Sequence, residues 1–480
     1  MSASHLTQLY KNHLSLLTDL YQLTMAYGYW KTGWHKKEAV FHLFYRRPPF
    51  DGKYVIACGL QLAIDYLQQL SFKPEEIHYL GSLKGADGES LFDESFLNYL
   101  QRIEFQCDID AIPEGTVVFP NQPLVRVKGP LIQAQLIETT LLTLINFSSL
   151  IATKAARVIQ AAPGDTVVDF GLRRAQGLDG GLTASRAAYI GGCHGTSNLL
   201  AGKLYNIPVK GTHAHSWVMC FEDELKAFET YAEVMPGNCV LLVDTYDTIK
   251  GIKNAIKVGH QLKEKGLALG GIRLDSGDLA QLSIQARKML DEAGLEKTAI
   301  VASNDLDEYK IKALKDRGAK ITVWGVGTRL ITAYDQPALG GVYKLAALRG
   351  TGGAWNYKIK HAENNGKVTN PHRLQVRRFF AKEKPVGDMI YNQENTPVSS
   401  NLISEKKTKV VNFEGNTFKD LMVPIFRAGT LVYKSRDIHD IRNRCLKQQD
   451  LFKAVEGSYP NGLEEGLYRL KMEMIKPHQS

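Results

Sequence analysis

Between about residues 146 and 350 the sequence repeats one pattern, in which a short apolar run leads into a polar turn and then an amphipathic stretch. The middle runs start roughly 25 to 30 residues apart, the length of one strand plus a crossover helix. This spacing predicts parallel strands joined by helices. Seven runs favour an irregular α/β barrel over an open, doubly wound sheet, which remains the alternative. The runs are TVVDF, PVKGT, NCVLLVD, LGGIRLD, KTAIVASN, ITVWGVG and VYKLAAL.

The residues between these runs predict amphipathic helices that end at glycine. The three clearest are TIKGIKNAIKVGHQLKEKG, DLAQLSIQARKMLDEAG and DEYKIKALKDRGAK. Each has apolar residues at helical spacing and a glycine in its last few positions, where a left-handed residue can stop a helix. We therefore place an α/β barrel domain over residues 146–350.

The sequence on either side of the barrel region differs in character. Residues 1–145 mix a helical stretch, LSLLTDLYQLTMAYGYWKTG, with short β-rich runs such as EAVFHLFYRR and EGTVVFPNQPLVRVKG, which predicts an α+β N-terminal domain. Residues 351–480 turn polar and irregular and close on a helical stretch, LEEGLYRLKMEMIK. We expect this C-terminal segment to pack back on the N-terminal domain.

Composition argues against several classes of protein. The chain has 59 lysines and arginines against 50 acidic residues, a net charge of +9, but its basic residues form no runs that would mark a nucleic-acid-binding arm. Small anionic metabolites are the better partners.

The sequence contains no run of about 18 uncharged apolar residues, so it predicts no membrane-spanning helix. The start, MSASHLTQLYKNHL, lacks the features of a targeting peptide, so we expect a cytoplasmic protein. Six scattered cysteines without a C-x-x-C pair indicate reduced thiols rather than a zinc site or a disulfide framework.

In an α/β barrel the active site lies at the carboxyl ends of the strands, so the polar residues that follow each apolar run are the candidates. Most of them have side chains or backbones suited to binding or catalysis. In chain order they are Arg173, Arg174, residues 212–215, Asp244, Asp275, Asp278, Asn304, Asp305, Gly327 and Thr328.

Three of these groups have a definite chemistry. The arginine pair in DFGLRRAQG can hold a carboxylate or a phosphate through a rigid fork of donors, or can be surface arginines that cap a helix. The acids of RLDSGDL, Asp275 and Asp278, can hold Mg²⁺ together with substrate phosphates. Asp275 with Ser276 also fits a helix N-cap, and the two interpretations are compatible. The turn G-x-G-T of VWGVGTRL, with Gly327 and Thr328, can bind a phosphate dianion through backbone N–H groups.

Two histidines one residue apart, His213 and His215, stand in GTHAHSWVMCF. Alternate residues of a strand point the same way, so an H-x-H metal site is one hypothesis, although no other strand end offers a histidine as a further ligand. Packing in the core is a second hypothesis, and it suits His213 better than His215. The third is an imidazole that attacks a phosphoryl group beside phosphate-binding groups.

Taken in order, the motifs of the chain resemble those of the nicotinate phosphoribosyltransferases. The resemblance covers most of the chain and rests on LLTDLYQLTMAYGYW, FHLFYRRPPF, DFGLRRAQG, GGLTASRAAYIGG, GTHAHSWVM, LLVDTYDT, GGIRLDSGDL, VASNDLDEY, WGVGTRL and PALGGVYKLAAL. The stretch EGTVVFPNQPLVRVKGPLIQAQLIETTLLTLIN is similar to the capping domain shared with quinolinate phosphoribosyltransferases. The resemblance implies an irregular α/β barrel of the type II phosphoribosyltransferase kind, with an α+β N-terminal capping domain and a C-terminal extension.

The activity that the resemblance implies is the condensation of nicotinate with 5-phosphoribosyl 1-pyrophosphate. The products are nicotinate mononucleotide, on the salvage route to NAD, and pyrophosphate, and coupling to ATP hydrolysis would class the enzyme as a ligase. Mg²⁺ is the implied cofactor. The implied assembly is a head-to-tail homodimer in which the N-terminal domain of one subunit caps the barrel of the other. All three substrates are anions, which suits a chain of net charge +9.

The resemblance also implies roles for single residues. His215 would be phosphorylated by ATP, with Asp244 or Asp275 as the acceptor that orients its ring, whereas His213 has no catalytic task. The ligand-binding residues would be Tyr21, which stacks on the nicotinate ring, Arg173, Arg273 and Thr212, which face its carboxylate or the ribosyl phosphates, and Gly327 with Thr328, which hold the phosphoribosyl phosphate.

Four alternative functions stay open. A nicotinamide phosphoribosyltransferase would not need an arginine for the carboxylate, and a quinolinate enzyme would need more basic residues and no phosphohistidine. A metal-dependent H-x-H hydrolase would hold stoichiometric zinc. An RNA-binding barrel would interleave aromatic residues with lysine and arginine, which this sequence does not do.

Overall fold

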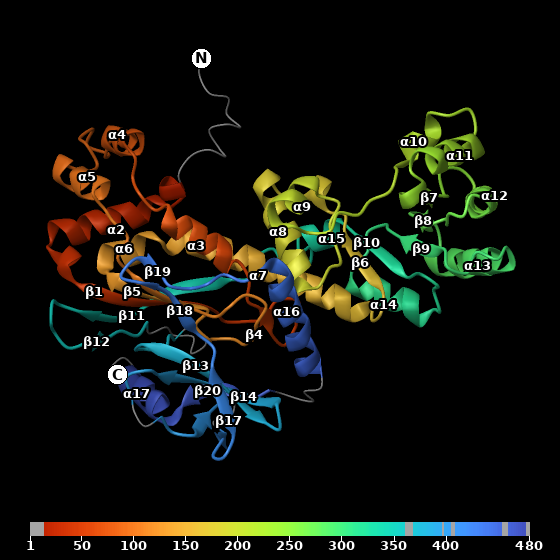
Figure 1. The fold of residues 1–480 in the computed structure, drawn as a ribbon. Helices are drawn as coiled ribbons and strands as arrows, with labels where there is room; N and C mark the ends of the chain where they lie inside the picture. The colour runs from red at the N-terminus through yellow and green to blue at the C-terminus, as the bar shows by residue number, and fades with distance from the viewer. Residues whose placement is uncertain (1–13, 361–367, 396–397, 405–408, 454–458, 477–480) are drawn as a thin grey trace. The chain divides into compact units, whose positions relative to one another are not determined.

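The computed structural model describes residues 14–360, 368–395, 398–404, 409–453 and 459–476. Residues 1–14, in which we found no features of a targeting peptide, lie outside these residues except for Leu14. The chain forms two compact units (Figure 1). Unit 1 takes residues 1–149, 338–437 and 447–480, and unit 2 takes residues 150–337 and 438–446.

Unit 2 is built on a parallel sheet of five short strands in the order β6-β10-β9-β8-β7. All five strands pair in parallel with their neighbours, as in the pairing of Thr166 to Asp169 with Val323 to Val326. Beyond β6 the sheet continues only as single bridges, from Asp169 to Thr196 and from Thr196 to Val209. The result is an incomplete barrel. Its strands are β6 (Thr166–Asp169), β7 (Val240–Leu242), β8 (Gly271–Leu274), β9 (Ala299–Ala302) and β10 (Val323–Val326).

The predicted helices of this unit are confirmed. They are α12 (Thr248–Glu264), α13 (Leu279–Glu292) and α14 (Glu308–Asp316). Each starts at an aspartate whose carboxylate accepts a backbone N–H of the first turn, and each stops two residues before a glycine with a left-handed backbone. The caps are Asp247, Asp278 and Asp307, and the glycines are Gly266, Gly294 and Gly318. The N-cap in RLDSGDL is therefore Asp278, not Asp275.

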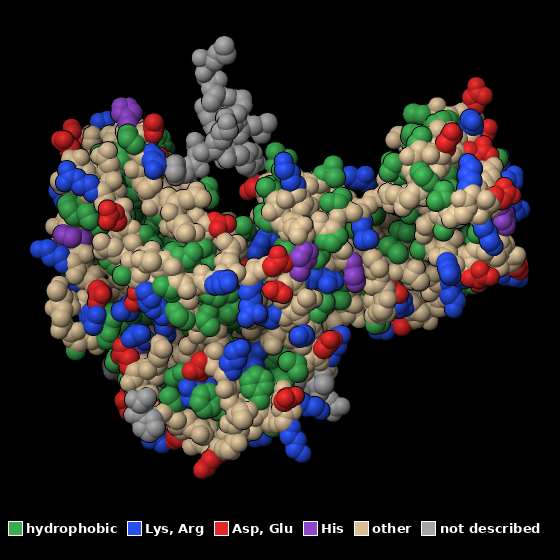
Figure 2. Space-filling view, viewed as in Figure 1, with side chains coloured by type: hydrophobic (Ala, Val, Ile, Leu, Met, Phe, Trp, Pro, Cys, Tyr) green, Lys and Arg blue, Asp and Glu red, His purple; other side chains and the backbone are tan. Residues whose placement is uncertain are grey.

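Shorter helices complete unit 2. They are η3 (Leu172–Arg174), α8 (Leu178–Gly191), α9 (Leu199–Tyr205), α10 (His215–Met219), α11 (Glu224–Val234), η4 (Pro236–Asn238), α15 (Thr328–Ile331) and the first part of α16 (Ile438–Lys453). On the face shown in Figure 2, basic and acidic side chains alternate over α12 and α13. The ion pair between Arg287 and Asp291, 2.8 Å apart, is one example. Mixed charge of this kind is typical of a solvated surface.

Two of the seven apolar runs do not become barrel strands. The run PVKGT contributes one bridging residue, Val209, because Pro208 has no N–H to extend a ladder. The run VYKLAAL forms β11 (Gly341–Arg349), which pairs antiparallel with β1 (Glu38–Tyr45) along eight residues of unit 1. The prediction of seven barrel strands was wrong at these two positions.

Unit 1 contains two larger sheets and a helical layer. The antiparallel sheet has the order β12-β11-β1-β5-β3-β18-β19, the mixed sheet has the order β16-β15-β20-β14-β13-β17, and β2 pairs with β4. The strands are β2 (Val55–Ile56), β3 (Asp108–Ala111), β4 (Val117–Val118), β5 (Val125–Pro130), β12 (Asn356–Tyr357), β13 (Leu374–Ala381), β14 (Lys384–Asn392), β15 (Asn401–Ile403), β16 (Val410–Asn412), β17 (Thr417–Asp420), β18 (Val423–Arg427), β19 (Thr430–Leu431) and β20 (Asn461–Glu464). The helices are η1 (Leu14–Leu16), α2 (Leu20–Lys31), η2 (Trp34–Lys36), α3 (Leu60–Gln68), α4 (Pro74–Ser82), α5 (Glu94–Gln101), α6 (Leu131–Leu136) and α17 (Glu465–Ile475).

The C-terminal segment divides between the units. Strand β18 pairs antiparallel with β3, and Arg378 on β13 donates to the carbonyl of Val117, so these residues lie within unit 1 beside N-terminal strands. Residues 438–446, by contrast, belong to unit 2, where Arg442 donates to the carbonyls of Gly192 and Cys193.

One helical stretch of the described chain is long and apolar enough to span a membrane by composition alone. It runs from Leu131 to Ala161, through α6 and α7 (Glu138–Ala161), and 61% of its most apolar window is buried inside the protein. Burial of this kind is what a core helix shows. The six cysteines all lie in the described residues and form no disulfide, and all except Cys220 are buried, which agrees with the prediction of mostly buried thiols.

Candidate active site

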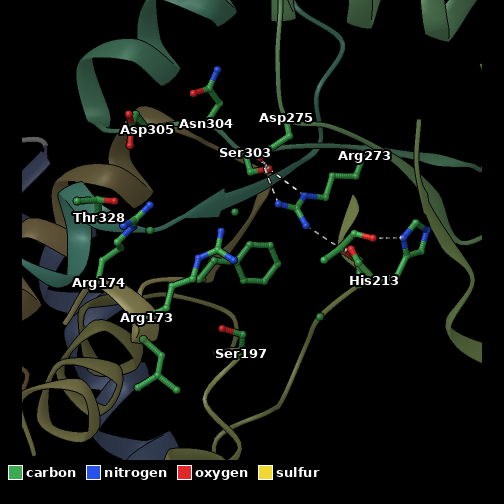
Figure 3. A pocket seen from close by; sticks show the side chains of 17 residues that line it. Arg173, Arg174, Ser197, His213, Arg273, Asp275, Ser303, Asn304, Asp305 and Thr328 are labelled. Atoms are coloured by element: carbon green, nitrogen blue, oxygen red, sulfur yellow. Dashed lines mark hydrogen bonds and ion pairs between the residues drawn. The ribbon is translucent and has the colours of Figure 1, made fainter. Parts of the chain in front are cut away.

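A cavity of 530 Å³ opens at the carboxyl ends of the unit 2 strands (Figure 3). This size suits one or two small ligands. Most sequence-predicted binding residues lie in its wall, and the complete lining is Phe170, Leu172, Arg173, Arg174, Ser197, Gly211, Thr212, His213, Ala214, Arg273, Asp275, Ser303, Asn304, Asp305, Gly325, Gly327 and Thr328. The predicted site residues outside this lining are Tyr21, His215, Asp244 and Asp278.

Arg273 at the end of β8 is held by three neighbours. Its Nε donates to Ser303 Oγ at 2.9 Å, one terminal nitrogen donates to Thr212 Oγ1 at 3.1 Å, and the other donates to Asp275 Oδ1 at 3.2 Å (Figure 3). Ser303 Oγ in turn donates to the same Asp275 oxygen. An arginine fixed on three sides presents its remaining N–H groups in one direction, which suits a planar carboxylate or a phosphate.

The loop with the arginine pair is anchored by Asp169 at the end of β6. The buried carboxylate accepts from the backbone N–H of Gly171 and from the hydroxyls of Ser185 and Thr196, each at 2.8 Å. Burial raises the pKa of Asp169, and these three donors act in the opposite direction. Above the anchor Arg173 and Arg174 form the 3₁₀ turn η3 and are exposed. Their guanidinium groups have no acidic partner among the described residues, so they are available to an anionic ligand.

Strained backbone borders the pocket after β9. Asn304 and Asp305 both have positive φ values, 107° and 45°, which non-glycine residues rarely adopt. The next turn along the sheet is the Gly-x-Gly-Thr segment, where Gly327 caps α15 and Thr328 is its first residue. Backbone N–H groups at the start of a helix have no intrahelical partner, so they are free to meet an anion.

His213 lines the pocket but its ring is bound to the protein on both sides. Nε2 accepts the backbone N–H of Leu242 on β7 at 3.2 Å, and Nδ1 lies 3.2 Å from the carbonyl of Ala214. Because Nε2 accepts, Nδ1 carries the proton and the ring is neutral. Burial lowers the pKa of His213, in keeping with this state. Its surroundings favour a structural role over an H-x-H metal site.

His215 lies beside the pocket lining, at the start of α10, and its side chain is 40% exposed. Its Nδ1 is 3.1 Å from Thr245 Oγ1, and its Nε2 is 3.8 Å from Asp275 Oδ2. Asp244 stands behind this pair and accepts from the backbone N–H of Asp275 and from the hydroxyl of Ser276, both at 2.7 Å. His215, Asp275 and Arg273 thus form one connected series of side chains.

Asp278 has a different environment from Asp275. Its Oδ1 caps α13 through the N–H groups of Ala280 and Gln281, and its Oδ2 pairs with Arg317 at 2.6 Å. These contacts, Arg317 first, lower the pKa of its carboxyl. A magnesium ion would therefore have to displace existing partners of Asp278, and within the described ranges no three His, Cys, Asp or Glu residues are grouped to hold a metal.

Comparison with known proteins identifies the family. The model of the nicotinate phosphoribosyltransferase (NAPRTase) family matches residues 166–376, and models of the N-terminal and C-terminal domains of these enzymes match residues 16–146 and 373–456. The nicotinate phosphoribosyltransferase of Bacillus subtilis (strain 168) is 44% identical over 475 residues, which cover 96% of this chain and 95% of that protein. The chain belongs to the nicotinate phosphoribosyltransferase family.

The structures agree with this assignment. The crystal structure of human nicotinic acid phosphoribosyltransferase has a TM-score of 0.80 with 30% identity, and covers 95% of this chain and 99% of that one. The nicotinate-nucleotide pyrophosphorylase of Pyrococcus furiosus, 22% identical with a TM-score of 0.70, shares the fold. The predicted fold class, an irregular α/β barrel of the type II phosphoribosyltransferase kind with additional N-terminal and C-terminal domains, is confirmed.

In this phosphoribosyltransferase Tyr21 belongs to unit 1, near the start of α2, and it is 48% exposed. Burial, Glu138 and Asp19 raise the pKa of its hydroxyl. Gln22 next to it is fully buried and donates to Glu138, which fixes the first turn of the helix. Tyr21 is not among the residues of the same chain that line the pocket of unit 2.

Among the pocket-lining residues that the sequence did not point to are Phe170, Ser197 and Ser303, and it did not point to Asp169, which anchors the loop of η3, either. Asp169 and Ser303 are the first polar residues after their apolar runs, and the rule that selected Arg173 and Asn304 finds both when it is applied to every strand. Phe170 is aromatic and lies 5.6 Å from the guanidinium carbon of Arg273. Ser197 follows no strand, so nothing in the sequence pattern pointed to it.

The protonation of His213 predicts a pH dependence of stability. Its pKa is lowered in the folded state, so below about pH 6.5, the unfolded value, the unfolded chain binds protons more readily and the free energy of unfolding falls. We expect His213→Gln to lose part of this decline, because glutamine keeps an acceptor for Leu242 without binding a proton. Denaturant unfolding at pH 7, 6 and 5 measures it.

His260 on α12 is exposed and belongs to the same unit, so His260→Gln controls for the loss of a histidine as such. The free energy of unfolding of His260→Gln should match that of the parent protein at each pH. An unchanged decline in His213→Gln would contradict the assigned role of His213.

Proposed function

We propose that this protein condenses nicotinate with phosphoribosyl pyrophosphate to nicotinate mononucleotide and pyrophosphate, and that it couples this reaction to ATP hydrolysis through a phosphohistidine at His215. The condensation is the reaction of the family to which the chain belongs. The observation that carries the detailed proposal is the placement of Arg273 between the pocket and Asp275, with Asp275 next to His215.

Arg273 and Phe170 together suit a pyridine carboxylate. Phe170 offers the one aromatic face in the described lining, and Arg273 offers a guanidinium whose orientation is fixed beside it. A ring against Phe170 would direct its carboxylate to Arg273 through charge-assisted bonds. We assign Thr212 to holding Arg273, since its hydroxyl accepts from that side chain.

The phosphate groups have two matching regions. Gly327 and Thr328 offer backbone N–H groups for the 5-phosphate, and the free arginines of η3 offer charge for the pyrophosphate. The pyridine nitrogen attacks C1 of the ribose while the bond from C1 to the pyrophosphate oxygen breaks. The enzyme transfers no proton in this step, so catalysis depends on positioning and on stabilising charge.

Mg²⁺ would neutralise charge on the departing pyrophosphate, and the residues present fit it in part. Asp275 lines the pocket, and Asp244 Oδ1 behind it is a buried oxygen with no hydrogen-bond partner in the described chain. We propose Asp275 as the protein ligand, supported by Asp244, with substrate phosphates and water completing the shell. Asp278 is the weaker of the two predicted ligands because both of its oxygens already have partners, whereas Asp275 Oδ2 faces only His215, 3.8 Å away, among its described contacts.

The contacts of His215 suggest which nitrogen attacks ATP. A carboxylate can only accept, so Asp275 favours the proton on Nε2, whereas the hydroxyl of Thr245 can donate to Nδ1 or turn away. Nδ1 would then attack the γ-phosphorus as the bond to ADP breaks. Asp275 is therefore the preferred one of the two candidate acceptors. The other implied features, a cytoplasmic location and a homodimer, belong to the same proposal.

An assay with and without ATP tests the proposal. His215→Ala should retain slow formation of nicotinate mononucleotide from nicotinate and phosphoribosyl pyrophosphate, because the residues that bind the ribosyl group are separate. It should lose the acceleration by ATP and the acid-labile phosphoenzyme. A phosphoenzyme that still forms in His215→Ala would show that another residue is phosphorylated.

Arg273→Ala should distinguish the acid from the amide. We expect the affinity for nicotinate to fall by about 2 to 5 kcal/mol, the cost of losing one partner of a buried charged pair, and the weak affinity for nicotinamide to fall far less. Binding measured by calorimetry tests this, with Arg287→Ala on α13 as the control for loss of an arginine outside the pocket. Equal losses for the two ligands would assign Arg273 to the phosphates instead.

The homodimer has a test of its own. Leu17, Leu20 and Tyr21 are 48 to 54% exposed on unit 1, which is typical of an interface when apolar side chains cluster. If Tyr21 serves the pocket of a second subunit, mixing Tyr21→Ala with Arg173→Ala protein should restore activity to about a quarter, since half of the dimers would be mixed with one intact site each. Mixtures as inactive as the separate variants would place Tyr21 outside the active site.

A further inference from the structure

Beneath the pocket, unit 2 contains a cluster of three cations and three carboxylates, which we call the charge clamp: Lys154, Arg157 and Arg329 with Asp307, Glu308 and Asp335. Lys154 on α7 is fully buried. Its Nζ lies 2.6 Å from Asp335 Oδ2 and 2.6 Å from Glu308 Oε2. The contact with Glu308 Oε2 is an ion pair whose geometry does not meet that of a hydrogen bond. Arg157, one turn further along α7, donates to Glu308 at 2.8 Å.

The clamp joins the two pocket turns that follow β9 and β10. Asp307 caps α14, and Glu308 is its first residue, three positions after the strained Asp305. Arg329 directly follows Thr328, and its guanidinium lies 3.3 Å from Asp307 Oδ2 and 3.8 Å from Asp335 Oδ1. Figure 3 shows Asp305 and Thr328 on the same side of the pocket.

The energetics of buried charge make such a connection stiff. Within these six residues every cation faces at least one carboxylate. The pair of Lys154 with Glu308 is buried, whereas Arg329 is 32% exposed and Asp335 30%. A shift of the turn at Glu308 would disturb the buried pair, and separating buried charges costs far more than separating exposed ones. Lys154, first among the causes, lowers the pKa of Asp335, so the acid stays ionised at neutral pH.

We propose that Arg329 is a positioning residue: through the charge clamp it holds the turns at 304–305 and 327–328 in register and so sets the affinity for the phosphorylated ribose. This inference rests on the proposed function, in which Gly327 and Thr328 bind the 5-phosphate. Arg329 touches no substrate in this account, since its side chain turns to Asp307, Asp335 and the ring of Tyr334, 4.3 Å away.

The test is steady-state kinetics of Arg329→Met. We expect the KM for phosphoribosyl pyrophosphate to rise by about tenfold or more, while the KM for nicotinate and kcat change less than about threefold. A role in stability alone would lower the active fraction, and with it the apparent kcat, and leave both KM values unchanged. Arg329→Met combined with Asp307→Asn removes both charges of one pair and should recover part of the loss.

The matched control is Arg287→Met, which removes an arginine paired with Asp291 on α13 and should leave both KM values unchanged. If Arg329→Met does not fold, Asp335→Asn, 30% exposed, replaces it with the same expected result. Thr328→Pro separates the two hypotheses, because proline is tolerated at the first position of α15 and removes the backbone N–H assigned to the 5-phosphate. If it raises the KM for phosphoribosyl pyrophosphate and Arg329→Met does not, the clamp inference is wrong; if it has no effect, the phosphate site itself is misassigned.

Discussion

The five parallel strands of unit 2 do not close a barrel by backbone hydrogen bonds alone. Side-chain hydrogen bonds connect the two edges of the sheet, and the pocket depends on them. On one edge the sheet continues past β6 only through Thr196 and Val209, and on the other edge β7 presents the N–H of Leu242. His213 accepts that N–H, from the segment that follows Val209. An imidazole thus replaces a strand-to-strand bond, and the loop that precedes His215 is fixed in place as a result.

A single carboxylate, that of Asp275, connects Arg273 in the pocket wall with His215 beside it. Asp275 accepts from Arg273 and Ser303 with one oxygen and faces His215 with the other. A group that changes the charge at His215 therefore acts on the carboxylate that holds Arg273. Electrostatic interactions are stronger in a partly buried site than in water, so under the proposed function a phosphate on His215 would alter the interaction of Asp275 with Arg273.

Much of this arrangement could be predicted from the sequence, and the failures have physical causes. Helix ends were predictable because an aspartate and a glycine specify them locally, as at Asp307 and Gly318. Strand ends identified much of the pocket wall, including Asp275 and Thr328, whereas Arg273 came only from the family resemblance. The fate of VYKLAAL was not predictable, since the same apolar run fits a barrel strand or a partner of β1, and only the long antiparallel pairing decides between them. Nor could the sequence give the contacts of Asp278, because Arg317 lies 39 residues away.

Residues 304 and 305 show how a strained turn is kept in a binding pocket. Asparagine and aspartate tolerate a left-handed backbone better than most residues, but two in succession still cost free energy that the local sequence cannot offset. The carbonyl of Asn304 accepts from Lys310 Nζ at 2.7 Å, and α14 is capped by Asp307 directly afterwards. With Arg329 and Lys154 binding the same helix start, the turn is restrained from three directions. Contacts with α7, α14 and α15 thus hold the strained turn between β9 and α14. The proposed role of Arg329 depends on this connection between charges outside the pocket wall and a turn that lines the pocket.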